Sequence, residues 1–314
     1  MTSIVDTLIS QLSFLGIDSQ IIFIIAVCIP ALSLFLVMSV NAMISVYMER
    51  KVSAFMQDRI GPMEVGIFGF KGGKKFWGGI GQTIADAIKL LSKEDIIPKD
   101  ADKILMTLAP FIIFIGAFLT LVAVPFAENL VVSDFNIGVF YIMATSSFGV
   151  IGIILAGWAS NNKWSLYGAM RAAAQIISYE IPIGLSFLLP VIVAGSLNLG
   201  DIVSWQADNR WFILHSPFTF VAFAIFFISV VAETNRVPFD IPEAESELVA
   251  GWMTEYSGFK WAIFFLSEYA NMLVVSLVAS IIFLGGWLSP FTLFNVLPDK
   301  WLFLDGPIFG FFWL

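Results

Sequence analysis

The sequence predicts an all-α, polytopic integral membrane protein, built as a single helical bundle over residues 1–314. Of the 314 residues, 59% are hydrophobic and only 13% are charged, the mean hydropathy is +0.90, and long stretches contain no charge. Soluble domains are roughly 45–50% apolar and about 25% charged. No ten-residue alternating pattern suggests a β-barrel, so helices must satisfy the backbone polar groups in lipid.

Uncharged runs locate the membrane spans, because one crossing takes roughly 20 apolar residues. We expect six complete spans: 21–48, 104–127, 137–159, 181–200, 216–232 and 269–298. The last run is longer than a span needs, and Gly285, Gly286 and Pro290 mark its expected exit.

The distribution of Lys and Arg sets the expected orientation, because inner loops carry the excess of positive charge. Fourteen of the sixteen basic residues lie in three loops, 49–103, 159–179 and 233–260, against Arg210 and Lys300 elsewhere. We expect these loops on the cytoplasmic side of a bacterial inner (plasma) membrane.

The first of these loops, 49–103, contains an expected amphipathic helix that lies in the membrane interface. Apolar residues after position 81 recur at helical spacing with charges opposite: Ile84, Ala87, Ile88 and Leu91 against Asp86, Lys89 and Lys93. The glycine-rich segment before it lacks the spacing of a phosphate-binding loop. We therefore expect neither a nucleotide site nor a nucleic-acid partner.

One cysteine and one histidine limit the chemistry of the chain, since Fe–S clusters need several Cys thiolates and haem usually needs an axial His. We expect no metal site, no redox centre and no catalytic residue in this chain. Cys28, in an apolar run, is expected to be a small core residue.

Three carboxylates lie within or at the edge of apolar runs, namely Glu180, Glu233 and Glu268. A charge at the bilayer centre costs at least ~2.5–3.5 kcal/mol, so such residues usually face a protein interior or a wet cavity. A position at the helix end would explain Glu180 and Glu233 without any function. Lys260, two turns away, could partly offset Glu268.

The acidic loop 233–260 contains the largest group of residues that suggest a function. Glu233 and Arg236 could pair on one helical face before Pro238 ends the helix, and Asp240 could cap a new helix. That account covers Asp240 and also Glu243, as an anion in the first turn, but it does not explain the total. Only Arg236 and Lys260 lie nearby to oppose the five acids Asp240, Glu243, Glu245, Glu247 and Glu255. Crowded carboxylates raise one another's pKa, and such groups can take up and pass on protons.

Arg50, Arg59 and Arg171 offer guanidinium groups at the membrane boundary, either as solvated inner charges or as ligands. Together with the acids they complete a set of motifs: Glu49-Arg-Lys51, Arg59-Ile-Gly-Pro62, Ala85-Asp-Ala-Ile-Lys89, Gly157-Trp-Ala-Ser160, Arg171-Ala-Ala-Ala-Gln175, Ala232-Glu-Thr-Asn-Arg-Val-Pro-Phe-Asp240 and Glu245-Ser-Glu-Leu248. These motifs closely resemble a family of respiratory complex I membrane subunits. In bacteria its members are the H subunit of NADH-quinone oxidoreductase, and in mitochondria they are NADH dehydrogenase subunit 1.

The resemblance implies eight transmembrane helices, of which this chain would hold six complete ones, with 307–314 resembling the start of the seventh. It also implies a quinone chamber that opens to lipid. The glycine- and lysine-rich segment 68–81 exceeds the compact mitochondrial form, which favours the bacterial membrane over the mitochondrial one.

By resemblance, the site residues fall into three groups. Quinone binding is expected of Arg50, Arg59, Arg236, Phe239 and Asp240. Proton coupling is expected of Glu180, Glu233, Glu243, Glu245, Glu247, Glu255 and Glu268. Supporting roles are expected of Glu49, Arg171 and Tyr256.

The expected function is that of a subunit of a proton-pumping NADH:quinone oxidoreductase, with ubiquinone or menaquinone as substrate. FMN and the Fe–S clusters would lie in partner subunits of the peripheral arm, and small membrane subunits and antiporter-like subunits would be neighbours in the lipid bilayer. Two alternatives remain open: the equivalent subunit of a relative that uses ferredoxin or another donor, and an ion-coupled secondary transporter. Transporters often carry internal repeats, but the stretch 236–240 has no second copy.

Overall fold

The computed structural model describes residues 3–15, 18–63, 65, 78–128, 130–242 and 245–289, and the regular elements among them are all helices. Five are long and apolar enough to cross a membrane: α2 (Ser19–Met56), α5 (Lys103–Val122), α6 (Gly138–Ala159), α7 (Lys163–Ala194) and α12 (Gly258–Phe283). A sixth, α10 (Pro217–Glu233), is apolar but shorter. The predicted fold class, a polytopic helical membrane bundle, is confirmed.

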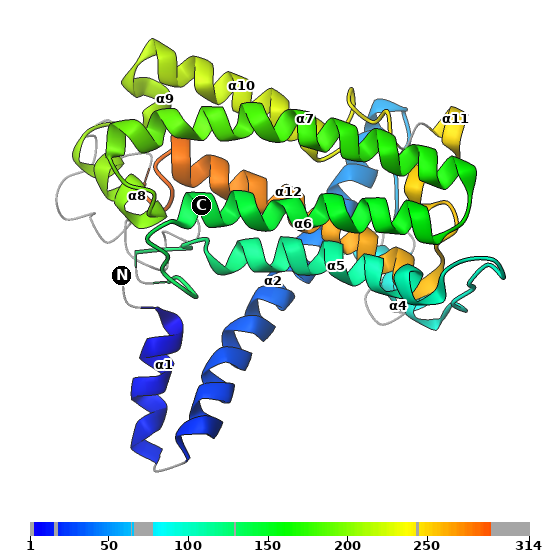
Figure 1. The fold of residues 1–314 in the computed structure, drawn as a ribbon, viewed down its shortest axis with the longest axis horizontal. Helices are drawn as coiled ribbons and strands as arrows, with labels where there is room; N and C mark the ends of the chain where they lie inside the picture. The colour runs from blue at the N-terminus through cyan, green and yellow to red at the C-terminus, as the bar shows by residue number, and fades with distance from the viewer. Residues whose placement is uncertain are drawn as a thin grey trace.

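Shorter helices connect or flank the spans. They are α1 (Ile4–Leu12), η1 (Ser13–Leu15), α4 (Gly81–Ser92), α8 (Leu199–Asp208), α9 (Phe212–His215), α11 (Glu245–Leu248) and η3 (Gly251–Met253). In Figure 1, α5, α6 and α7 run side by side, α12 lies behind them, and α2 leaves the bundle at a steep angle with α1 beside its first half.

Two predicted spans have different bounds in the structure. Helix α7 begins at Lys163 rather than after Glu180, and α12 covers Gly258–Phe283 instead of 269–298. Both predicted spans begin directly after an embedded glutamate. Because these carboxylates have polar partners inside the bundle, the helices continue through them. Gly285 and Gly286, with φ of +83° and +59°, follow the end of α12, as predicted.

The helices begin at polar caps that the sequence supplies. The carboxylate of Asp102 accepts from the backbone N–H of Ile104 and Leu105 at 3.0 and 3.1 Å at the start of α5. Ser216 forms a capping box with Thr219 at the start of α10, where Pro217 occupies the first turn. The amphipathic helix predicted after residue 81 is confirmed as α4, with the apolar side chains of Ile88 and Leu91 exposed.

Small residues let the spans approach closely, as is common where lipid provides no hydrophobic drive between helices. A Cβ on Gly152 of α6 would lie 2.3 Å from the Cγ1 of Ile113 on α5. The buried hydroxyls of Thr120 and Thr145 join the same two helices at 3.0 Å. Cys28, expected in the core, is instead exposed on α2, because it lies on the face of this helix that turns away from the bundle, next to the exposed Val27 and Ile29.

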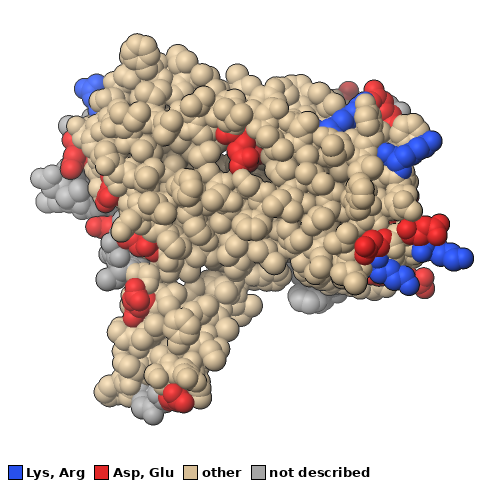
Figure 2. All heavy atoms as spheres, in the orientation of Figure 1, with Lys and Arg blue, Asp and Glu red and all other residues tan. Residues whose placement is uncertain are grey.

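The three basic loops meet at one end of the bundle. The N–H of Asp102 donates to the carbonyl of Ala159 at 3.0 Å, and the N–H of Ile96 donates to Ser257 Oγ at 3.2 Å. On the face shown in Figure 2, Lys and Arg gather at the end that carries α4 and α11, whereas acids predominate at the other end. This arrangement supports the predicted common side for the three loops.

We predict that Gly168→Ala destabilises the protein by about 1–3 kcal/mol, the usual effect of overpacking. A Cβ on Gly168 of α7 would lie 2.7 Å from the Cα of Gly251, so backbone would have to move. The matched control is Gly149→Ala in α6, because nothing lies within 4 Å of the added carbon there. Thermal unfolding in detergent should show a lower midpoint for the first variant only; equal midpoints would contradict the packing described.

Candidate functional site

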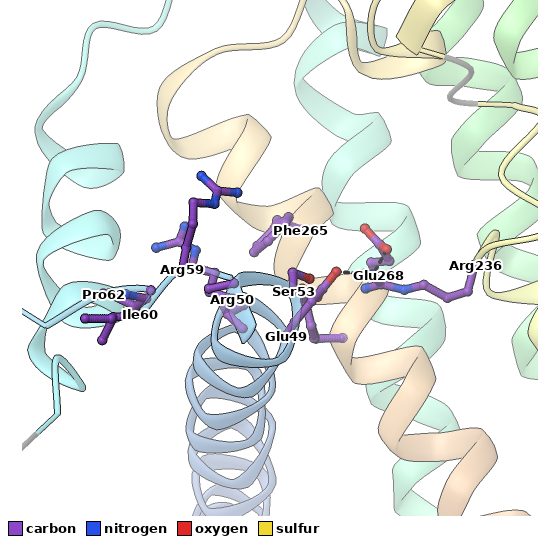
Figure 3. A pocket seen from close by; sticks show the side chains of 13 residues that line it. Glu49, Arg50, Ser53, Arg59, Ile60, Pro62, Arg236, Phe265 and Glu268 are labelled. Carbon is purple, nitrogen blue, oxygen red and sulfur yellow. Dashed lines mark hydrogen bonds and ion pairs between the residues drawn. The ribbon is translucent and has the colours of Figure 1, made fainter. Parts of the chain in front are cut away.

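Helix α2, the loop after it and helix α12 line an open cavity of about 790 Å³, which we call cavity A. Its apolar wall comes from Val46, Ala54, Ile60, Pro62 and Phe265, and its polar wall from Glu49, Arg50, Ser53, Arg59, Arg236, Glu268 and Tyr269. Figure 3 shows Arg236 reaching from the loop after α10 toward Glu49 and Glu268. The structure thus brings the three predicted arginines of the quinone site together.

Arg236 is the centre of the polar wall. Its Nη1 donates to Glu49 Oε1 at 3.0 Å, and its Nη2 lies 2.9 Å from Glu268 Oε1 as an ion pair. The guanidinium also lies 5.1 Å from the ring centroid of Tyr269, whose hydroxyl donates to Glu49. Burial lowers the pKa of Arg236, but Glu268, Tyr269 and Glu49 outweigh this effect, so its pKa lies above the ordinary value. Arg236 is therefore a fixed cation.

The end of α10 explains why Arg236 can reach this position. Asn235 is left-handed, with φ of +51°, and the N–H of Arg236 donates to the carbonyl of Val231 at 3.1 Å, a helix-ending motif. The predicted Glu233–Arg236 pair is therefore wrong, since the helix ends at Glu233, ahead of Pro238. The new helix predicted directly after Asp240 is also wrong, because residues 241–242 form a turn and α11 begins at Glu245.

Lys260, expected to offset Glu268, does not do so. It is buried and pairs with Asp95 at 3.0 Å between Nζ and Oδ2. Glu268 is instead paired with Arg236, which comes from a different segment of the chain. Arg50 similarly pairs with Asp86 of α4, which fixes this helix against α2.

Two smaller cavities lie in the bundle and share lining residues with cavity A or with each other. Cavity B, about 80 Å³, is lined by Glu268 and Glu233, and cavity C, about 40 Å³, by Glu233 and Glu180. Glu268 also lines cavity A, so each neighbouring pair of cavities shares one carboxylate in its wall. Ser147 Oγ donates to Glu180 Oε1 at 2.6 Å. The three glutamates predicted from the apolar runs therefore line cavities that share wall residues.

The other predicted residues lie apart from this series. Phe239 packs edge-on against Tyr179, with ring centroids 5.6 Å apart, and Asp240 is exposed; neither lines cavity A. Glu247 is exposed and pairs with Arg171 at 2.9 Å. Glu255 accepts from Asn162 Nδ2 at 2.5 Å in a surface pocket. Glu243 and the side chain of Glu245 lie outside the described residues.

Several residues of the site had no assigned role in the sequence prediction. Gln175 Nε2 donates to the carbonyls of Ala232 and Phe239, both at 2.8 Å, and so holds the loop that carries Arg236. Its place in the Arg171–Gln175 motif was the available signal. Ser147 offered no signal, because a serine in an apolar run gives no indication of which helix it faces.

No cluster of three His, Cys, Asp or Glu side chains able to hold a metal ion occurs in the described part of the chain. The side chains that converge are cations, carboxylates and hydroxyls around an amphipathic cavity. Such an arrangement can bind a polar, uncharged or anionic ring and exchange protons with it.

Fold and site define a polytopic membrane protein with a charged cavity beside smaller cavities lined by carboxylates in its helical bundle. The NADH dehydrogenase family profile matches residues 29–314, and the chain therefore belongs to this family. Similar curated proteins are named as the H subunit of NADH-quinone oxidoreductase. The one from Chlorobaculum parvum is 50% identical, over 86% of this chain and 73% of its own length, and the one from Geobacillus thermodenitrificans is 54% identical, over 76% and 68%. The predicted family, and with it a complex I membrane subunit, is confirmed.

Tyr256 provides a test by pH. It is buried, its hydroxyl donates to the carbonyl of Ala156 at 3.4 Å, and burial raises its pKa above the ordinary value. The folded state therefore keeps the phenol proton where the unfolded chain releases it, so this contribution to stability is complete below about pH 10 and falls as the pH rises further.

We predict that wild-type protein loses thermal stability more steeply than Tyr256→Phe between about pH 9 and about pH 11. The difference should approach about 1.4 kcal/mol per pH unit. Thermal unfolding in detergent at each pH measures it, and parallel curves for the two proteins would show that Tyr256 is not buried as described.

Proposed function

We propose that this chain forms the quinone chamber of a proton-translocating NADH:quinone oxidoreductase in a bacterial inner membrane. Cavity A would hold the quinone headgroup, and cavities B and C would carry protons away from it. One observation carries the proposal: Glu268 and Glu233 each stand in the wall between two successive cavities. Family membership argues against the alternative of an ion-coupled transporter.

Cavity A suits a quinone in size and chemistry. Ligand pockets typically measure about 300–1,000 Å³ and combine apolar walls with a few oriented polar groups. Phe265 and Ile60 supply apolar surface for the ring, while Arg59 and Arg236 supply N–H donors for its carbonyl oxygens. Because Arg236 remains charged, it would stabilise the negative charge that the ring gains on reduction.

Electrons would reach the quinone from an Fe–S cluster in a peripheral-arm subunit, because the chain has only one cysteine and one histidine. That subunit would bind at the end of the bundle where the basic loops meet. FMN would lie further along the arm, and small and antiporter-like membrane subunits would adjoin the helices beyond cavity C.

Coupling would act through Arg236. Its guanidinium is shared between Glu49 and Glu268. A reduced, more negative ring would draw on the same cation and weaken its hold on Glu268, which would then take up a proton. Glu233 and Glu180, reached through the shared cavities, would respond in turn. Such coupling requires an interaction that differs between the oxidised and reduced states, and the shared arginine provides it.

We predict that Ser53→Trp raises the KM for quinone roughly tenfold, because the indole would fill part of cavity A at a cost of about 1.4 kcal/mol. Val52→Trp is the matched control, since Val52 is the preceding residue of α2, is 48% exposed and does not line the cavity. Quinone-dependent kinetics of the assembled complex in membranes measure both variants. An unchanged KM for Ser53→Trp would show that quinone does not bind in cavity A.

We predict that Glu180→Gln and Glu233→Gln each reduce proton pumping by about tenfold or more, while the complex still assembles. A proton path through a carboxylate requires a group that can both gain and lose a proton. Asp208→Asn, at the exposed end of α8, is the control for a lost charge. The measurement is acidification of proteoliposomes per electron transferred.

Glu247→Gln distinguishes two proton paths: the one expected from the sequence, which includes Glu247, and the one through the three cavities, which does not. Because Glu247 pairs with Arg171 at the surface, we expect normal pumping in this variant. Full pumping in Glu180→Gln together with loss in Glu247→Gln would place the path outside the three cavities.

A further inference from the structure

Trp252 lies where the acidic loop meets the cavities. It belongs to η3, packs between α7 and α12, and is only 6% exposed. Ser165 Oγ donates to its backbone carbonyl at 3.0 Å, and Gly168 lets α7 approach its backbone. These contacts hold the indole in the wall of cavity B, which Glu233 and Glu268 also line.

The indole Nε1 of Trp252 is buried and has no hydrogen-bond partner in the described part of the chain. An indole nitrogen is a donor only, and buried tryptophans usually find an acceptor for it. The ring of Phe264 stands perpendicular to the indole at 4.6 Å between centroids and offers no oxygen. Because Trp252 lines cavity B, the contents of this cavity are the candidate acceptor.

Cavity B is suited to water. Its volume of about 80 Å³ compares with the roughly 10–15 Å³ that one water needs by the same kind of measure, and a buried water needs two to four polar partners. The walls provide them: the carboxylates of Glu233 and Glu268, the amides of Asn235 and Asn271, and the hydroxyls of Thr120 and Ser146. An apolar ligand would leave the indole Nε1 of Trp252 without an acceptor.

We propose that Trp252 is a positioning residue of the proton path, whose Nε1–H binds the oxygen of a water in cavity B and turns the hydrogens of that water toward Glu233 and Glu268. This inference rests on the proposed function of the cavities. A water that accepts the indole N–H uses one of its two lone pairs. Both of its O–H groups remain free to donate to carboxylates. A proton given up by one carboxyl group enters the water cluster as another leaves it for the second carboxylate, so the cluster's charge is conserved.

Trp252→Phe tests this role, because phenylalanine keeps the aromatic packing against Phe264 but removes the donor. In the assembled complex in proteoliposomes, we expect pumping per unit time to fall about fivefold, the factor that corresponds to one lost hydrogen bond. The solvent deuterium isotope effect on coupled turnover should rise. Trp287→Phe is the matched control, since Trp287 is equally buried, at 4% exposed, and lines none of the three cavities.

A second measurement does not depend on any variant: a cryo-EM map of the wild-type complex that resolves ordered water. Density within hydrogen-bond distance of Trp252 Nε1 supports the proposal, whereas a dry cavity, or an indole N–H directed at the face of Phe264, overturns it. Normal pumping and an unchanged isotope effect in Trp252→Phe overturn it as well. If Trp252→Phe, Glu180→Gln and Glu233→Gln all pump normally, both the role of Trp252 and the proposed function are wrong. If only Trp252→Phe pumps normally, the role of Trp252 alone is wrong.

Discussion

The pairing of Arg236 with two carboxylates from different spans is the interaction on which the site depends. An unpaired charge in a partly buried position is costly, and Arg236, whose side chain is only 27% exposed, is offset by Glu49 and Glu268. Glu49 comes from α2 and Glu268 from α12, and the ion pairs at 3.0 and 2.9 Å hold the two helices around cavity A. Structure and chemistry are therefore linked: a ligand that competes for Arg236 alters the charges that join the helices.

The three cavities extend this dependence into the membrane. Glu268 faces both the large cavity and the first small one, and Glu233 faces both small ones. Around them the bundle is closely packed, with glycines and buried hydroxyls where α5 and α6 touch.

Sequence reasoning succeeded where the relevant physics is local. Hydropathy located the five long apolar helices and the shorter α10, although with other bounds for α7 and α12. Helical periodicity located α4, and the cost of a charge in lipid identified the embedded glutamates as interior groups. It failed where the partner of a charge lies far away in the chain. Nearness in sequence favoured Lys260 beside Glu268 and Arg236 beside Glu233, whereas the structure pairs Lys260 with Asp95 and Arg236 with Glu49 and Glu268. The early end of α10, set by the left-handed Asn235, decides this exchange.

The sequence by itself determined the membrane environment, the helical class, the family motifs and the identity of the interior carboxylates, because lipid imposes those constraints residue by residue. Only the tertiary structure decided which cation neutralises which acid, which acids share a cavity, and that Glu247 and Glu255 lie at the surface. The reason is geometric: ion pairing and cavity formation depend on distances between spans that lie far apart in the chain, such as Glu49 and Arg236 at a separation of 187 residues, and no local pattern encodes those distances.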